Sequence, residues 1–205
     1  MLSPNEQENL ETYNQIASGW AATMRSDFWL KEYENFQKFL PSGKVLDIGC
    51  GSGADSLWFT KNNYDYTGVD ISETMIRLAK EGNAEANFEV KSFYELDFPP
   101  QNFDGFWSAC SLIHAEREKI QEVLFGIKRV LKTGAIGFVA VKEGAGEKMA
   151  PWQDSGKKRF FVYYGQDEFA KILQTAGFEI LQIATRPPPD SRQDGTFLVY
   201  YVKNK

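Results

Sequence analysis

The stretch at residues 44–53, Lys-Val-Leu-Asp-Ile-Gly-Cys-Gly-Ser-Gly, constrains the fold of this chain more than any other. A short apolar run that carries one acid, Asp47, is followed by glycines at alternate positions, and a helical pattern begins at Ala54. Glycine has no Cβ, so the backbone here can turn sharply and approach a ligand closely. A strand, a tight glycine turn and a helix N-terminus together predict a nucleotide-binding corner.

The segments around this corner alternate between strand-like apolar runs and helical patterns, which predicts a doubly wound α/β fold with a parallel sheet. The predicted strands are residues 45–48, 64–69, 87–91, 105–109 and 135–141, and the predicted helices between them are 54–62, 72–81 and 116–131. Two helical stretches within residues 6–40 come first. A long loop (142–158), a helix (166–176) and two strands (178–185 and 196–202) follow. With no helix between them, those two strands are expected to pair antiparallel.

Composition excludes several classes of protein. A chain of 205 residues fits one domain, and its net charge of −5 argues against a dedicated nucleic-acid binder. The one obvious basic run, residues 157–159, is more often a solvated face, and contact with an acidic substrate is the alternative. Cys50 and Cys110 are expected to be free thiols, and no Cys/His cluster predicts a metal site. The polar first ten residues and the absence of a long apolar run predict a cytoplasmic protein with no membrane partner.

Three interpretations of the glycine corner compete: a structural turn, a dinucleotide site and an S-adenosylmethionine site. Asp47 discriminates between the two ligands, because a pyrophosphate beside its carboxylate would be repelled. A ligand that carries an ammonium and a sulfonium would be attracted, so the acid favours the cationic ligand. A small NAD-dependent oxidoreductase stays an alternative, although the chain lacks the usual Tyr-x-x-x-Lys spacing.

Asp70 ends the second predicted strand, about twenty residues beyond the glycines. A carboxylate at that place can accept both hydroxyls of a ribose, and the alternative is an acid that caps the next helix. Ile71 and Met75 follow and are candidates either for the face of an adenine or for the core.

Four segments in this order resemble the class I S-adenosylmethionine-dependent methyltransferases: residues 45–53, Val69-Asp70, 103–107 (Phe-Asp-Gly-Phe-Trp) and 131–135 (Leu-Lys-Thr-Gly-Ala). The resemblance extends over about residues 10–202. It implies a Rossmann-like, seven-stranded mixed sheet in the order 3-2-1-4-5-7-6, with strand 7 antiparallel. It also implies one methyltransferase domain over residues 1–205, with an N-terminal helical lid (1–40), a cofactor-binding core (44–141) and a C-terminal substrate side (142–205).

The same resemblance implies S-adenosyl-L-methionine as cofactor. Asp47, Gly49 and Gly51 would line its methionine end and Asp70 its ribose, and Cys50 between the glycines would be a further cofactor contact. Ser92 and Phe93 fall at the adenine, with Ser92 in place of the family's usual acid. Further contacts are expected from Ile71, Met75, from the backbone of Ala109 and Cys110, and from Tyr13 and Arg25 in the lid.

Methyl transfer is an in-line displacement, so a base is needed only when the acceptor must lose a proton. His114, the only histidine, follows the fourth predicted strand. We expect it to face the acceptor as a base or hydrogen-bond donor; the alternative is a cap on the next helix. Compact size and acidic charge favour a small-molecule acceptor. A tRNA or protein acceptor and a non-catalytic nucleoside-binding protein are the alternatives, and the oligomeric state is not predicted.

Overall fold

The computed structural model describes residues 2–23, 27–152, 156–188 and 195–205. Its helices are α1 (Pro4–Thr23), α2 (Leu30–Phe39), α3 (Ser56–Lys61), α4 (Glu73–Gly82), α5 (Ile120–Val130) and α6 (Gln166–Thr175). Its strands are β1 (Lys44–Ile48), β2 (Asp65–Asp70), β3 (Asn87–Val90), β4 (Phe103–Ala109), β5 (Leu131–Glu143), β6 (Glu147–Pro151), β7 (Lys158–Tyr164), β8 (Phe178–Arg186) and β9 (Phe197–Asn204). Two short 3-10 turns, η1 (Leu112–His114) and η2 (Arg117–Lys119), precede α5.

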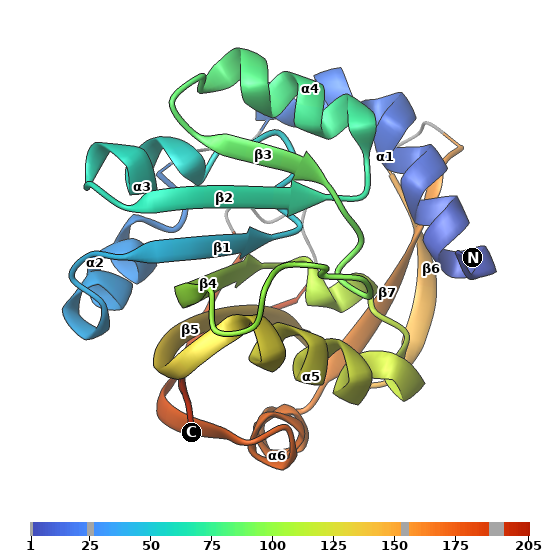
Figure 1. Ribbon diagram of the computed structural model, residues 1–205. Coiled ribbons are helices and arrows are strands. Elements are labelled where there is room, and N and C mark those ends of the chain that lie inside the picture. Colours follow the sequence, from blue (N-terminus) through green and yellow to red (C-terminus); the bar gives the residue numbers. More distant parts are fainter. Residues whose placement is uncertain (1, 24–26, 153–155, 189–194) are drawn as a thin grey trace.

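The central sheet confirms the predicted α/β fold (Figure 1). Strands β3, β2, β1, β4 and β5 lie side by side and all pairs among them are parallel. Beyond β5, β9 pairs antiparallel with β5 and β8 pairs antiparallel with β9. These seven strands therefore follow the predicted order, with β8 as strand six and β9 as the antiparallel strand seven.

The predicted count of seven strands is wrong, because the structure contains nine in its described residues. The predicted loop at 142–158 includes β6, which forms an antiparallel hairpin with β7. β7 also pairs parallel with the last residues of β5, where Lys142 lies opposite Tyr163. Residues 160–164, Phe-Phe-Val-Tyr-Tyr, are aromatic or β-branched, which explains why this segment extends the sheet.

Two hydrophobic clusters cover the two faces of the sheet. Side chains of α5 and α6 pack on one face, and side chains of α2, α3 and α4 pack on the other. The second cluster is rich in aromatic rings: Trp107 of β4 stacks on Phe138 of β5 with ring centroids 3.7 Å apart. Strands β1 and β4, in the middle of the sheet, are buried on both faces, as in other parallel sheets with helices on each side.

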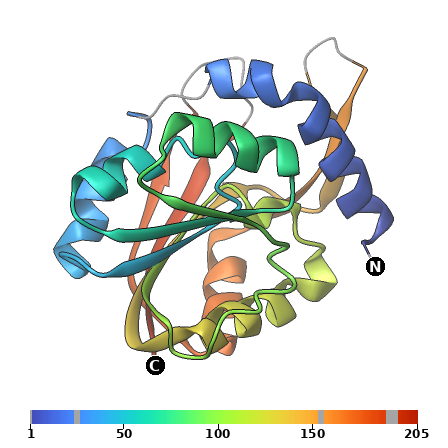
Figure 2. The ribbon, with the colours of Figure 1, turned by 45° about the horizontal axis from the view of Figure 1, so that its top comes forward.

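Helix α1 lies apart from both layers and crosses the sheet end between α4 and the β6–β7 hairpin (Figure 2). Asn9 Oδ1 accepts from the backbone N of Phe160 at 2.7 Å, and Thr12 Oγ1 donates to the backbone O of Lys158 at 2.7 Å. At its other side, Asn14 Oδ1 accepts from Ser72 Oγ at 2.6 Å. Polar side chains thus hold α1 as a roof over the carboxyl ends of the strands. No helix in the described ranges has the length and apolar character needed to cross a membrane.

Candidate functional site

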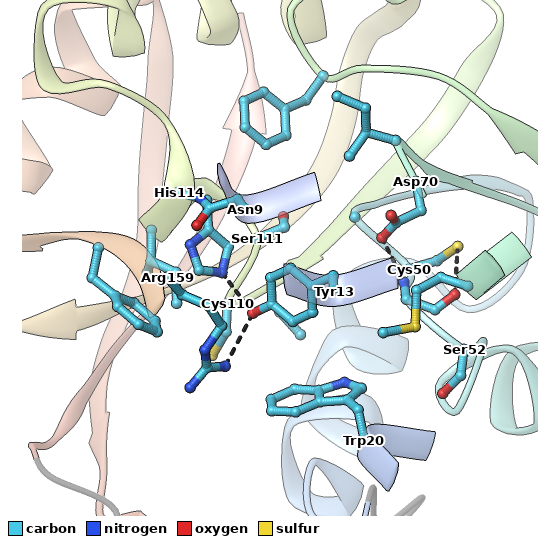
Figure 3. Close-up of a pocket in the computed structure, with 18 of the residues that line it drawn as sticks. Asn9, Tyr13, Trp20, Cys50, Ser52, Asp70, Cys110, Ser111, His114 and Arg159 are labelled. Carbon is cyan, nitrogen blue, oxygen red and sulfur yellow. Dashed lines mark hydrogen bonds between the residues drawn. The ribbon is translucent and has the colours of Figure 1, made fainter. Parts of the chain in front are cut away.

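A cavity of about 1180 Å³ lies between α1 and the carboxyl ends of β1, β2, β4 and β5 (Figure 3). The residues on its wall include most of those that the sequence predicts for a cofactor site: Tyr13, Gly49, Cys50, Gly51, Asp70, Ile71, Met75, Ser92, Phe93, Ala109 and Cys110. His114 lies on the same wall. Arg25 lies outside the described residues. The fold thus brings one predicted set of side chains together around one space.

The glycine turn after β1 is held by backbone hydrogen bonds: the N–H groups of Gly49 and Cys50 both donate to the carbonyl O of Val69, at 2.8 and 2.9 Å. Gly49 (φ +72°) and Gly51 (φ +53°) have left-handed backbones, which favours glycine at both positions. A Cβ on Gly49 would lie 2.2 Å from the Cβ of Ser111, whereas a Cβ on Gly51 would meet no atom within 4 Å. Gly49 is therefore required by packing, and Gly51 leaves open space beside the turn.

The carboxylate of Asp70 joins the two turns of this corner. Its Oδ2 accepts from the N–H of Gly51 and its Oδ1 from the N–H of Ser72, both at 2.9 Å. Burial raises its pKa, and these two N–H groups act in the opposite direction. Ser72 Oγ accepts from the N–H of Met75 at 3.0 Å and so caps α4. Asp70 is therefore not the cap of this helix.

Asp47 differs from its predicted place. Its side chain is buried, 1% exposed, and does not line the cavity; Oδ2 accepts from the Tyr66 hydroxyl at 2.5 Å. β1 lies in the middle of the sheet with helices on both faces, so its side chains are enclosed. Asp47 therefore does not lie where a ligand in the cavity would contact it directly, contrary to the prediction. Its carboxylate lies on β1, just before the glycine turn.

A second acid, Asp55, does line the cavity and the sequence analysis missed it. Its carboxylate accepts from the hydroxyl of Tyr33 and, at 3.0 Å, from Nε1 of Trp107. Burial raises the pKa of Asp55 and, with repulsion from Asp55 and Asp70, raises that of Asp47. The sequence does contain a signal for Asp55, because this acid lies in the turn directly after the glycines. A positively charged ligand would relieve this crowding of carboxylates.

His114 lies on η1 at the other end of the cavity, and α5 begins only after Lys119, so the alternative that it caps this helix is wrong. Its Nδ1 lies 2.6 Å from the carbonyl O of Phe160. A carbonyl oxygen only accepts, so Nδ1 carries the proton and Nε2 accepts from the Tyr13 hydroxyl at 2.9 Å. Burial lowers the pKa of His114 to about 3. The neutral ring therefore presents an acceptor, and the predicted donor role does not fit.

Aromatic rings and one guanidinium complete this end of the cavity. Arg159 Nη1 donates to the Tyr13 hydroxyl at 3.2 Å, on the side of Tyr13 away from Asp70 (Figure 3). Phe161 and Tyr163 of β7 line the cavity, whereas Phe160, Val162 and Tyr164 are buried in the core and do not line it. The alternation along a strand explains this split. Lys158, next to Arg159, is exposed, so the basic run contributes one residue to the cavity.

Cys110 lies on the wall with a left-handed backbone (φ +63°), which is uncommon for a residue that is not glycine. Burial raises the pKa of its thiol to about 12. The thiol is therefore protonated at neutral pH, which agrees with a packing role and not with a nucleophile.

A protein-family model described as a methyltransferase domain matches residues 45–134. The chain is 28% identical over 157 residues to phosphoethanolamine N-methyltransferase 3 of Arabidopsis thaliana, covering 73% of this chain and 31% of that protein. It is 26% identical to phosphoethanolamine N-methyltransferase of Plasmodium falciparum, covering 67% of this chain and 54% of that one. The matched part of the chain thus spans 31% and 54% of the length of these two curated relatives.

Among solved structures, the fold matches 1,6-didemethyltoxoflavin-N1-methyltransferase of Burkholderia thailandensis with a TM-score of 0.80 at 19% identity. The match covers 100% of this chain and 92% of that one, and that structure holds S-adenosylhomocysteine and the compound 1,6-didemethyltoxoflavin. These comparisons and the ordered motifs of the sequence indicate the same kind of protein. The match to a methyltransferase domain over residues 45–134 and the shared fold support the resemblance to the class I S-adenosylmethionine-dependent methyltransferases.

Proposed function

We propose that this protein transfers a methyl group from S-adenosyl-L-methionine to a small-molecule acceptor. The observation that carries the proposal is that one cavity has two chemically different ends. One end has a glycine turn with the acids Asp55 and Asp70, and the other has His114, Arg159 and aromatic rings. A cationic cofactor suits the first end, which leaves the second for the acceptor.

In this proposal the cofactor is held mainly by backbone and acids. Asp70 accepts from the ribose hydroxyls with the lone pairs that its two backbone bonds leave unused. Gly51 gives the ligand room. Asp55 on the wall, and Asp47 beneath it, stabilise the positive charges of the ammonium and the sulfonium. The adenine lies among apolar and small polar side chains on the wall: Ile71, Met75, Ser92 and Phe93.

The volume of the cavity favours a small acceptor. A pocket for one drug-sized ligand occupies about 300–1,000 Å³, and this cavity, at about 1180 Å³, is larger. It therefore has room for a cofactor and a second small molecule together. The roof formed by α1 fits the proposed lid role of residues 1–40, because a roof that closes over both molecules excludes water from the displacement.

The chain contributes to the reaction chiefly by placing donor and acceptor in line. His114 Nε2 faces the cavity through the Tyr13 hydroxyl and can accept a hydrogen bond from the acceptor's N–H or O–H when that group takes the place of Tyr13. With a pKa of about 3, the ring is a weak base. We therefore assign His114 an orienting role. It would take a proton only from an acceptor group that is already acidic.

Isothermal titration with S-adenosylhomocysteine and, separately, with NADH tests the cofactor. We expect the first to bind and the second not to bind. Transfer of a tritiated methyl group from S-adenosylmethionine is then measured on small-molecule and on macromolecular fractions of a cell extract. Label in the small-molecule fraction supports the proposal. Binding of NADH alone, or label only in RNA or protein, contradicts it, and cofactor binding without any transfer indicates a nucleoside-binding protein instead.

A further inference from the structure

Arg159 is a cation in the cavity wall that has no anionic partner among the described residues. No carboxylate of the described residues forms an ion pair with it, and its one hydrogen bond there is to the neutral hydroxyl of Tyr13. Its Nε is buried and has no hydrogen-bond partner. A guanidinium has five N–H donors, so most of its capacity is unused. Leaving a buried N–H donor unpaired in this way is costly unless something else binds it.

The guanidinium is nevertheless held in place by rings. Its central carbon lies 4.7 Å from the ring centroid of Trp152, 4.9 Å from Phe161, 5.3 Å from Trp20 and 5.6 Å from Tyr13. Cation–π contacts of this kind fix the position of a guanidinium and leave the N–H groups at its edge free to bind. The arrangement resembles a preorganised binding group more than a structural ion pair.

The surroundings add positive charge at this end of the cavity. Lys142 and Lys148 also line it, with Nζ 5.0 Å from the ring centroid of Phe161 and 4.9 Å from that of Tyr163, respectively. The one acid of α1 on the wall, Glu6, accepts from the N–H of Ser3. In contrast, Asp55 and Asp70 lie on the cofactor side of Tyr13. The charge of the cavity therefore changes sign from one end to the other.

We propose that the methyl acceptor carries an oxyanion, a carboxylate or a phosphate, and that Arg159 binds this group. The planar guanidinium can donate two parallel hydrogen bonds to either oxyanion, the geometry for which arginine is best suited. Binding there places the rest of the acceptor between Arg159 and the cofactor end, beside Tyr13 and His114. The inference rests on the proposed function, since it identifies the class of acceptor for the same site.

The test uses the full chain saturated with S-adenosylhomocysteine, in a buffer free of oxyanions and at constant ionic strength. Sodium benzoate, benzamide and inorganic phosphate are titrated by calorimetry; benzoate and benzamide differ in charge, and phosphate distinguishes the two oxyanions. We expect benzoate to bind at least tenfold more tightly than benzamide, or phosphate to bind measurably. Arg159→Gln should weaken the anion that binds by at least tenfold, and Arg159→Lys should weaken it less.

The matched control is Lys158→Gln, which removes the same charge from the neighbouring exposed residue and should leave anion affinity unchanged. Every variant should keep its affinity for S-adenosylhomocysteine, which also shows that it folds. Equal binding of benzoate and benzamide without phosphate binding, no binding of any probe, or full anion affinity in Arg159→Gln overturns the inference while the proposed function stands. Failure of the wild type to bind S-adenosylhomocysteine overturns the proposed function, and the inference with it.

Discussion

The two ends of the cavity are built in different ways. At the proposed cofactor end, the chain bonds to nearby parts of itself: Asp70 accepts from Gly51, 19 residues away, and from Ser72, two residues away. At the proposed acceptor end, side chains meet over long separations: Tyr13 contacts His114 across 101 residues and Arg159 across 146. The first end consists of backbone groups fixed by a turn, and the second consists of side chains brought together by α1, η1 and β7.

This difference has a physical consequence. Backbone N–H groups in a tight turn are available in any sequence that can adopt the turn. The proposed cofactor end therefore depends on glycines at the turn and on one carboxylate. The acceptor end depends on the identity of individual side chains, which can change without altering the sheet. We therefore expect substitutions at the first end to disturb the fold or cofactor binding, and those at the second to change the choice of acceptor.

The largest effect is expected for Gly49→Ala. The new Cβ would lie 2.2 Å from that of Ser111, whose hydroxyl lies 2.7 Å from Ser108 Oγ, and alanine is strained at φ +72°. Overpacking and strain together should lower the free energy of unfolding by about 3 kcal/mol. Urea unfolding followed by circular dichroism measures this change.

Gly126→Ala in α5 is the control, because its Cβ would meet no atom within 4 Å and alanine favours a helix. It should leave stability unchanged or raise it by about 0.5–1 kcal/mol. If Gly49→Ala were as stable as the wild type, the cofactor end would not depend on the geometry of its turn, and the comparison between the two ends would fail.

A smaller effect is expected for Asp70→Ala on the affinity for S-adenosylhomocysteine. The substitution removes the acceptor of the Gly51 and Ser72 N–H groups together with the proposed ribose contact. A charge-assisted hydrogen bond contributes about 1.5–3 kcal/mol, so the dissociation constant should rise by about 10- to 150-fold. Calorimetric titration measures it.

Asp65→Ala is the matched control, because this exposed acid begins the same strand that Asp70 ends. It should bind S-adenosylhomocysteine as the wild type does. Arg159→Gln should also keep this affinity, which would separate the two ends directly. An unchanged dissociation constant in Asp70→Ala would exclude the ribose contact.

The smallest effect is a pH dependence that originates at the acceptor end. Folding holds the pKa of His114 at about 3, below its ordinary value of 6.5, so between these values the unfolded chain binds a proton that the folded protein does not. Stability attributable to His114 is therefore lost as pH falls, by about 1 kcal/mol between pH 6 and pH 5. The buried acids act with the opposite sign, since burial raises the pKa values of Asp47, Asp55 and Asp70.

Comparison with His114→Gln isolates this contribution, because both proteins share the acids. Unfolding free energies measured at pH 6 and pH 5 should fall by about 1 kcal/mol more in the wild type than in the variant. The difference between the two slopes is the quantity of interest, so a change in baseline stability does not affect it. Parallel slopes would mean that the ring is protonated in the folded protein and is not enclosed as described.

Sequence patterns predicted the local structure of the glycine corner well because its determinants are local. The glycine turn, Asp70 at the end of β2 and Ser72 at the start of α4 each follow from a short stretch of chain. The direction of the Asp47 side chain could not be predicted from the sequence. A strand that is covered on both faces shows no alternation of apolar and polar residues that would tell the two faces apart. Strand β6 was predicted as part of a loop because residues 147–151 are mostly exposed and do not alternate between apolar and polar side chains.

By itself, the sequence determined the doubly wound parallel sheet and the corner at residues 44–53, because hydrophobic period and glycine placement act over short distances. The order of the strands followed only from the resemblance to a known family. Only the tertiary structure decided that Asp47 lies beneath the cavity and Asp55 on its wall. It also decided that Tyr13, His114 and Arg159 meet. Such contacts depend on how α1 and β7 pack across the sheet end, and no local pattern encodes a meeting of residues more than a hundred positions apart.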